Sequence, residues 1–331
     1  MKYAVFTHTI DNKKTKVRNS IITLIFLAVG LSASAQHLTP PKTYWQSFGY
    51  QKQPDHLQTV HYKSDSLGYE PTTVLVKSFN KEGFIIQDYI EVLGNFASKT
   101  AHNYVYKNGV LDSINTLTTN KNFNSTQKLH YDANGKLSKI ISNGTYTNYA
   151  DHFTYDHNGL VQTIQRKYAD EQSTLTATFN HQKNYVTEVD ALKNGEKKTR
   201  YFVYEGDDLF AMISGKSIYT IRFYNNFHRY NFEIEVEKDA LQYALDKRKL
   251  YQQDEKYLGK LLEEKNGKIV YDIPAETKNE NKDVIRQLEL DKLYKTTKRR
   301  LIFSKYVYAD GTTSGSTEMD LIFESKVRKM K

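Results

Sequence analysis

The chain has 331 residues, with 47 basic and 38 acidic side chains and a formal charge of +9. Residues 1–35 hold five basic groups and one acid, so the remainder carries 42 basic and 37 acidic residues, a charge of +5. This excess is weaker than a dedicated nucleic-acid binder requires, so we expect no nucleic-acid partner. Cysteine is absent, which excludes disulfides, thiolate zinc sites and a cysteine nucleophile.

The N-terminal segment has the pattern of a secretory signal peptide. Four basic residues between positions 13 and 18 precede the apolar run 21–31, and Ala33-Ser34-Ala35 follows it. A basic flank, a short apolar core and an A-x-A site are the three parts of such a leader. The run has about half of the roughly 20 residues that span a bilayer. We predict cleavage between Ala35 and Gln36, no integral membrane segment in the mature chain, and a periplasmic or secreted protein.

A repeat of about 25 residues runs through the middle of the chain. Its clearest copies are 104–111, 129–137 and 153–161, and weaker copies flank them. The anchoring aromatic residues are Phe79, Tyr106, Tyr131, Tyr155, Phe179 and Tyr204, which lie 27, 25, 24, 24 and 25 residues apart. Such regular spacing predicts structurally equivalent units that are stabilised by stacking on their neighbours.

Each unit reads as a β-hairpin. Aromatic residues two positions apart share one face of a strand, and Asn-Gly supplies the two positive-φ positions of a type I′ turn. The next aliphatic pairs, such as Leu137 and Ile140, are three residues apart. That spacing breaks strict alternation and predicts a β-bulge in the second strand. About six units therefore predict a mainly β protein whose hairpins form one antiparallel meander, curled or coiled because so many strands do not stay flat.

The motifs at Tyr131-Asp132-Ala133-Asn134-Gly135 and Tyr155-Asp156-His157-Asn158-Gly159 resemble the YD repeats of the Rhs and teneurin type. The resemblance covers roughly residues 75 to 215. It implies a β-rich, exported protein, with adhesion, glycan contact or encapsulation of a C-terminal toxin as family roles. The chain has no Asp-Pro, so the family's self-cleaving motif is missing. About six units are also too few for a closed cocoon.

The organisation that follows has four parts. They are the signal peptide at 1–35, a lead-in and cap at 36–73, the β-repeat region at 74–236, and a C-terminal region at 237–331. The last is α+β, with a long amphipathic helix over about 238–265, a polar loop over 275–283, and strands at 301–308 and 319–323.

No catalytic or metal-binding constellation stands out, and we expect no cofactor and no metal. Asp151-His152 and Asp156-His157 are acid–base or metal candidates, but the second pair lies in a hairpin turn, where Asp is favoured for turn hydrogen bonds. Asp207-Asp208 occupies a similar position and falls short of the six or more oxygen ligands of Ca²⁺. The basic cluster Lys295, Lys298, Arg299 and Arg300 could face phosphate groups, against the simpler interpretation of a solvated surface.

The aromatic ladder is the strongest binding candidate. Its members are Tyr104, Tyr106, Tyr131, Phe153, Tyr155, Phe202 and Tyr204. An open ladder would offer stacking platforms for a glycan or an extended peptide, whereas a closed one is core. The simpler interpretation is core, because a long exposed aromatic row promotes aggregation.

Three functions remain open. The first is an exported, non-enzymatic structural, adhesive or ligand-binding module of the cell envelope, with a glycan or an envelope protein as partner. The second is an envelope glycan- or peptide-acting enzyme with its site between the sheet and the C-terminal helix. The third is a toxin- or immunity-related component.

Overall fold

The computed structural model describes residues 43–330, apart from 66–67, 96, 146–147, 170–173, 183, 192–195, 206–207, 216–217, 225–229, 254–267, 270, 292–297 and 329. The predicted leader and its cleavage site, Ala35 and Gln36, lie outside the described residues. The described part of the chain is mainly β. Its strands join into one large antiparallel sheet, and only two α-helices accompany it.

The first half of the sheet consists of β1 (Pro54–Asp65), β2 (Gly68–Phe79), β3 (Ile85–Val92), β4 (Ser98–Lys107), β5 (Val110–Thr118), β6 (Ser125–Tyr131), β7 (Leu137–Gly144), β8 (Tyr149–Tyr155) and β9 (Val161–Tyr168). It continues with β10 (Thr174–His181), β11 (Tyr185–Ala191), β12 (Lys197–Glu205), β13 (Asp208–Gly215), β14 (Tyr219–Tyr224) and β15 (Tyr230–Val236). The C-terminal strands are β16 (Lys268–Ile269), β17 (Tyr271–Lys278), β18 (Val284–Asp291), β19 (Lys298–Tyr308) and β20 (Thr313–Gly315). The helices are α2 (Ala240–Gln253) and α4 (Leu321–Val327), with short 3₁₀ turns η2 (Trp45–Phe48) and η3 (Lys121–Phe123).

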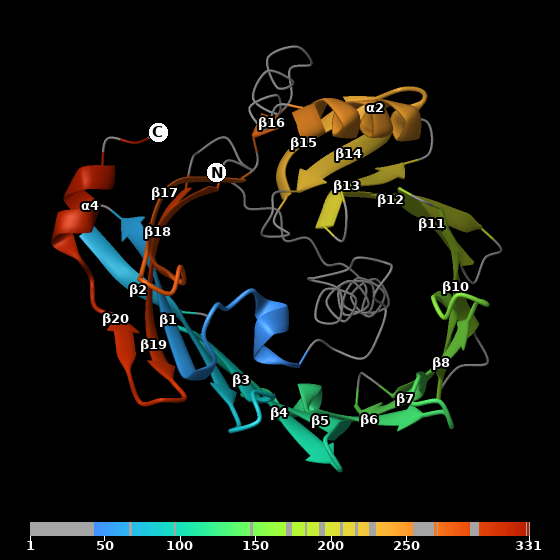
Figure 1. Ribbon diagram of the computed structural model, residues 1–331, viewed down its shortest axis with the longest axis horizontal. Helices are drawn as coiled ribbons and strands as arrows, with labels where there is room; N and C mark the ends of the chain where they lie inside the picture. The colour runs from blue at the N-terminus through green and yellow to red at the C-terminus, as the bar shows by residue number, and fades with distance from the viewer. Residues whose placement is uncertain are drawn as a thin grey trace, which may run out of the picture.

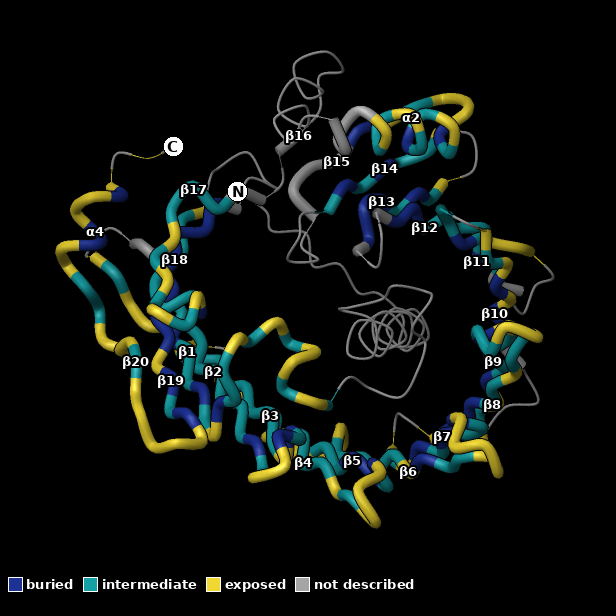
Figure 2. The backbone as a smooth tube through the Cα atoms, in the orientation of Figure 1, coloured by how far each residue is buried: buried dark blue, intermediate teal, exposed yellow. Residues whose placement is uncertain are grey.

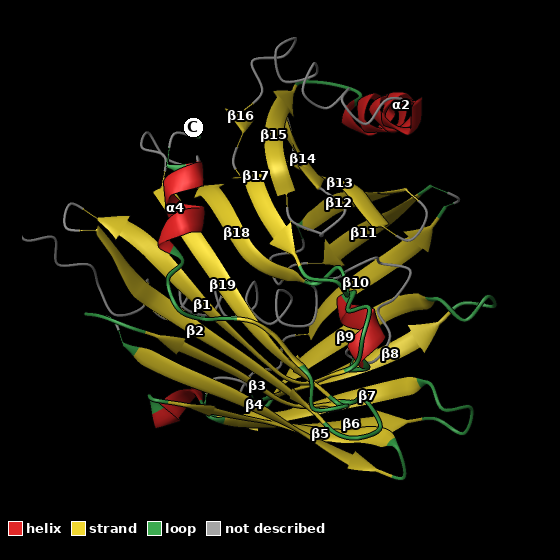
Figure 3. Ribbon diagram, turned by 60° about the vertical axis from the view of Figure 1, so that its left-hand side comes forward, coloured by secondary structure: helices red, strands yellow, loops and turns green. Residues whose placement is uncertain are grey.

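Strands β1 to β15 follow one another as a meander, as predicted, and β19 pairs with β1 on its other side. The sheet curls round, so that β16 and β17 return beside β15 and β18 (Figure 1). No backbone pairing joins β16 to β17 in the described part of the chain, so the ladder of hydrogen-bonded strands is open. Figure 3 shows the same strands tilted side by side.

The two faces of the curled sheet differ in what covers them. Helix α2 packs on Val203, Ala211, Ile213 and Ile221, on the outside of the curve (Figure 1). Helix α4 covers Leu288, Leu301 and Phe303 in the same way. We call this side the outer face. Because side chains alternate along a strand, Phe202 and Tyr204 point away from α2, to the inner face.

The inner face holds two further apolar clusters that run along the meander. One is centred on Leu111, Ile114, Leu129, Leu137 and Ile140. The other contains Val161, Ile164, Phe179, Val186 and Tyr204. Phe153 packs against both, so they form a continuous layer. Exposed residues gather at the hairpin ends (Figure 2).

The predicted bulges are present. In the β6–β7 pair, His130 faces Lys139 and Tyr131 faces Leu137, so Ser138 is the extra residue. The same shift occurs in β2–β3, β4–β5, β8–β9 and β12–β13, each time at the anchoring aromatic residue. The β10–β11 pair runs without a shift.

The predicted type I′ turn is correct at one site and wrong at two. Asn108 and Gly109 both have positive φ, 51° and 75°. In the turns after Tyr131 and Tyr155 only Gly135 and Gly159 do, at 75° and 79°. The reason is the preceding Asp. Asp132 Oδ1 accepts hydrogen bonds from the backbone N–H of Asn134 and of Lys136, both at 2.9 Å. These bonds stabilise a three-residue loop in which glycine alone is left-handed.

The ends of the chain differ from the sequence prediction in several places. Residues 54–65 form strand β1 and residues 68–73 belong to strand β2, so the predicted boundary at 73 falls inside β2. Residues 43–50 contact the turn between β2 and β3. Trp45 N–H donates to Gly83 O at 2.9 Å, and Ile85 N–H donates to Thr43 O at 2.7 Å.

Two C-terminal predictions are wrong. The loop expected at 275–283 is strand β17 up to Lys278, and only 279–283 is a turn. In place of the strand expected at 319–323, helix α4 begins at Leu321, because Asp320 accepts from the N–H groups of Ile322 and Phe323 and caps the helix. The predicted strand at 301–308 lies within β19. Helix α2 covers 240–253 of the predicted 238–265; residues 238–239 precede the helix, and 254–265 lie outside the described residues.

The Asp-held turns give the first prediction. Asp132→Ala removes both side-chain hydrogen bonds and should lower the free energy of unfolding by about 1 kcal/mol. Asp132→Asn keeps an acceptor oxygen and should stay close to wild type, since Asn80 and Asn279 hold equivalent turns through Oδ1. Urea unfolding of the three proteins measures this. An Asn variant as unstable as the Ala variant would contradict it.

Candidate functional site

The structure places the predicted aromatic ladder on the inner face, at the rim where the hairpins turn. Its members Tyr104, Tyr106, Tyr131, Phe153, Tyr155, Phe202 and Tyr204 all pack against the two inner clusters. Tyr204 is 1% exposed, and the others are half-buried. The ladder is therefore packed against aliphatic side chains along its length. Its role in binding stays a prediction.

The ladder hydroxyls link each hairpin to the one before it. Tyr106 Oη donates to Ile85 O at 2.8 Å, Tyr131 Oη to Leu111 O at 2.9 Å, and Tyr155 Oη to Leu137 O at 2.6 Å. In every case the acceptor is the residue that faces the previous anchoring aromatic across a bulge. We call these bonds the rim clamps.

The rim clamps replace missing backbone hydrogen bonds. Pairing between β5 and β6 stops at Ser113 and Lys128, and pairing between β7 and β8 stops at Lys139 and His152. The carbonyl groups nearer the turn would lack a strand partner, and a buried carbonyl without one is costly. The tyrosine hydroxyl supplies the donor.

One rim clamp is made by a histidine. His181 Nε2 lies 2.7 Å from Val161 O, the position equivalent to Leu111 and Leu137. A carbonyl only accepts, so Nε2 carries the hydrogen. His181, and not Phe179, is thus the counterpart of Tyr131 and Tyr155. Phe179 lies two residues before His181, as Phe153 lies two residues before Tyr155, so Phe179 is the counterpart of Phe153. The even spacing of the aromatic residues in the sequence concealed this offset.

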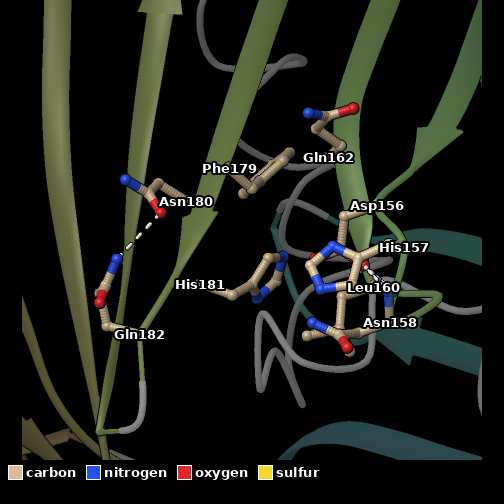
Figure 4. Close-up of a pocket in the computed structure, with 9 residues that line it drawn as sticks. All are labelled: Asp156, His157, Asn158, Leu160, Gln162, Phe179, Asn180, His181 and Gln182. Carbon is tan, nitrogen blue, oxygen red and sulfur yellow. Dashed lines mark hydrogen bonds between the residues drawn. The ribbon is translucent and has the colours of Figure 1, made fainter.

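A hollow of about 380 Å³ opens beside His181, between the 156–160 turn and the end of β10 (Figure 4). It is lined by Asp156, His157, Asn158, Leu160, Gln162, Phe179, Asn180, His181 and Gln182. We call it the rim hollow. Apart from Asp156 and the apolar Leu160 and Phe179, its lining is side-chain amides and imidazoles. Figure 4 shows the rings of His157 and His181 projecting into the same space.

The polar groups of the rim hollow differ in how far they are engaged. Asp156 Oδ1 accepts from the N–H groups of Asn158 and Leu160, both at 2.9 Å. These backbone bonds, led by that of Leu160, lower the pKa of Asp156 below its usual value. Gln182 Nε2 donates to Asn180 Oδ1 at 3.1 Å. His181 Nδ1 is buried and accepts from no described group, so it is an acceptor facing no partner.

The other sequence candidates are not brought together. Asp151 points to the inner face, where Arg166 Nε and Nη2 bind its two oxygens at 2.7 Å each. His152, the next residue, points to the outer face, so the pair cannot act on one substrate. Asp156 and His157 belong to a turn, as the simpler interpretation expected. Asp207 lies outside the described residues, and so does the side chain of Asp208.

The predicted basic cluster is largely engaged in structure. Arg299 donates to Val327 O at 2.7 Å and also to Met330 O, and Arg300 pairs with the buried Glu289 at 3.2 Å. Lys295 lies outside the described residues. Between α2 and the sheet the described contacts are an apolar cluster and one hydrogen bond, from Arg248 Nε to Tyr204 O. In the described ranges no group of three or more His, Asp or Glu side chains is arranged to hold a metal ion.

Comparison with known proteins gives weak likenesses. No protein-family model matches the chain, and no curated protein matches its sequence. A porin-like protein from Bacteroides uniformis is similar with a TM-score of 0.37 and 10% identity, over 77% of this chain and 97% of that one. The TcdB2-TccC3-Cdc42 complex is similar with a TM-score of 0.27 and 10% identity, over 54% of this chain and 13% of that one. Both TM-scores are too low to support a functional argument. Among the described helices, none has the length and apolar character needed to cross a membrane.

The rim clamps give the second prediction. Tyr131→Phe and Tyr155→Phe each keep the ring but remove the hydroxyl that donates to a strand carbonyl. Each should lower the free energy of unfolding by about 1 kcal/mol. Tyr89→Phe is the control, because its hydroxyl meets the side chains of Glu91 and Lys99 and makes no rim clamp. It should change stability by less than about 0.5 kcal/mol. Equal effects in all three variants would show that the clamps add nothing.

The third prediction concerns alkaline pH. Burial, together with the charges of Tyr106 and Asp112, raises the pKa of Tyr131 from 10.0 to about 12. The fold therefore favours the neutral phenol. The contribution of Tyr131 to the free energy of unfolding is complete below pH 10 and is lost as the pH rises from 10 to about 12. Tyr131→Phe should lose less stability over that interval than wild type. Parallel stability curves in urea at pH 9, 10, 11 and 12 would contradict the expectation.

Proposed function

We propose that this chain is an exported, non-enzymatic binding module of the cell envelope, built from about six equivalent hairpins, that holds a neutral glycan in the rim hollow. The observation that carries the proposal is the lining of that hollow. Side-chain amides offer donors and acceptors together, and imidazoles do the same in their neutral form. A ligand covered with hydroxyl groups uses both at once.

The arrangement of charge favours a binding role over hydrolysis. A glycosidase of the usual kind needs two carboxyl groups about 5 to 10 Å apart. The rim hollow has one, Asp156, and its Oδ1 holds the turn through two backbone N–H groups. The adjacent Phe179 offers an apolar wall for the face of a sugar ring.

The repeat itself is part of the proposal. Five hairpins share a bulge at the anchoring aromatic residue, and four successive side chains make a rim clamp to the hairpin before. These shared features support equivalent units and a structural role for most of the ladder. The signal peptide pattern of residues 1–35 supports export.

The fourth prediction tests the rim hollow. A hit from an array of neutral oligosaccharides should bind the Asn158→Ala/Gln182→Ala double variant about tenfold more weakly, because two polar partners are lost. Isothermal titration measures the change. The control is Asn134→Ala/Gln46→Ala. Asn134 has the equivalent turn position, and its N–H likewise donates to the preceding Asp, but it lies in another hairpin.

Three outcomes would overturn the proposal. They are binding of peptides with no neutral glycan bound, equal loss of affinity in the control variant, and turnover of the oligosaccharide by the wild-type chain. Thermal unfolding of both double variants confirms that the comparison is made on folded protein.

A further inference from the structure

The outer face of β6 to β9 presents basic side chains without acidic ones. Counting from the register, its outward positions are Thr126, Lys128, His130, Lys139, Ile141, Asn143, Ala150, His152, Thr154, Thr163, Gln165 and Lys167. None is Asp or Glu. The carboxylate of these strands, Asp151, points inward to Arg166.

The basic residues form two rows across the strands. Lys128 faces Ile141, which faces Ala150, which faces Lys167. Two residues along, His130 faces Lys139, which faces His152. With neighbouring strands about 4.8 Å apart, Lys128 and Lys167 start roughly 14 Å from each other. We call this set of three lysines and two histidines the outer basic face.

Its lysines differ from those on β4. Lys99 pairs with Glu91 at 3.0 Å, and Lys107 pairs with Asp112 at 3.1 Å. Lys128, Lys139 and Lys167 make no ion pair with any carboxylate of the described ranges. The field they create reaches His152, whose pKa is lowered by burial and then by Lys139 and Lys167.

The residues between the lysines indicate which polyanion fits. Surfaces that enter a membrane interface combine Lys or Arg with Trp, Phe or Leu, and single-stranded nucleic acid stacks on aromatic platforms. Apart from Ile141 and Ala150, the outward positions between the basic residues carry Thr, Asn and Gln, whose side chains hydrogen-bond to hydroxyl groups. The convex face would touch a flat bilayer over a narrow strip, whereas a flexible polymer follows its curve.

We infer that the outer basic face of β6 to β9 is a docking surface for an anionic polysaccharide. This inference goes beyond the proposed function. The outer basic face lies on the opposite side of the sheet from the inner clusters and shares no residue with the rim hollow. Attraction between exposed charges is screened by salt, so binding weakens as ionic strength rises.

The test uses the full mature chain with polygalacturonate as probe. Dextran, phosphatidylglycerol vesicles and poly(dT) are measured beside it, at 20 and 200 mM NaCl. The Lys128→Gln/Lys139→Gln/Lys167→Gln variant should bind polygalacturonate about tenfold more weakly at low salt. The Lys52→Gln/Lys99→Gln/Lys107→Gln variant removes the same charge from lysines already paired with Asp310, Glu91 and Asp112. It should change affinity less than about twofold.

Equal losses in the two triple variants would overturn the inference, because net charge alone would then explain binding. Tighter binding of vesicles or poly(dT) than of polygalacturonate would overturn it as well, as would no binding at 20 mM NaCl. The ring resonances of His152 give a readout that needs no variant. Polygalacturonate should shift them in the wild-type chain, and unshifted resonances under saturating polymer would place the polymer elsewhere.

Discussion

The bond from each rim side chain to the hairpin before it is the interaction on which the meander depends. A bulge in the second strand of a hairpin ends backbone pairing with the next hairpin early, and leaves a carbonyl near the turn without a strand donor. Tyr106, Tyr131, Tyr155 and His181 each supply that donor across the gap. Bulges also bend and twist a strand. The same feature that creates the need for a clamp therefore curls the sheet, and the curl brings the aromatic side chains together on the inner face. Where the bulge is missing, in β10–β11, backbone bonding continues further and Tyr204 N–H reaches Asn184 O at 2.9 Å.

Farther from the rim, charged pairs on adjacent strands help to fix the register of the sheet. Asp151 and Arg166, Glu188 and Arg200, and Glu289 and Arg300 each lie directly opposite one another on adjacent strands. All three carboxylates are buried, and burying a charge is costly unless its partner is in place. Arg166 also lies over the ring of Tyr149, 3.8 Å from its centroid. A slip of one residue would move each arginine to the opposite face of the sheet from its carboxylate. These pairs therefore penalise misaligned strands more than they stabilise the aligned sheet.

Local chemistry explains which features the sequence revealed. Turns and bulges depend on residues a few positions apart, so Asn108-Gly109 and the Leu137–Ile140 spacing predicted them correctly. The predicted turn type at 132–136 was wrong, because the prediction relied on Asn-Gly alone. The carboxylate of Asp132 selects the longer loop. The segments 275–278 and 319–323 failed for another reason. Ala275 is paired with Leu288 across the β17–β18 hairpin, a pairing that the polar composition of the segment concealed. Asp320 acts through a cap that outweighs the strand pattern of Leu321 to Phe323. The clamp at His181 could not be found by searching for aromatic residues, since what recurs is a donor that reaches a carbonyl.

That exception is also where the rim hollow lies. Three successive clamps are made by tyrosines, whose six-membered rings fill the space at the rim. The fourth clamp is made by the smaller imidazole ring of His181. Among the side chains that line the space beside His181, Asp156 holds the 156–160 turn, His181 Nε2 makes the clamp and Phe179 belongs to the inner cluster. The amide side chains of Asn158 and Gln162 take part in none of these interactions. Natural sequences break their own local rules most often where function requires it. Because side chains alternate between the two faces of a strand, the rim hollow and the outer basic face are separate surfaces. Inner positions and the rim are committed to clamps, clusters and ion pairs, whereas the outer basic face of β6 to β9 takes part in none of them, so its lysines can be replaced without disturbing the interactions that align the strands.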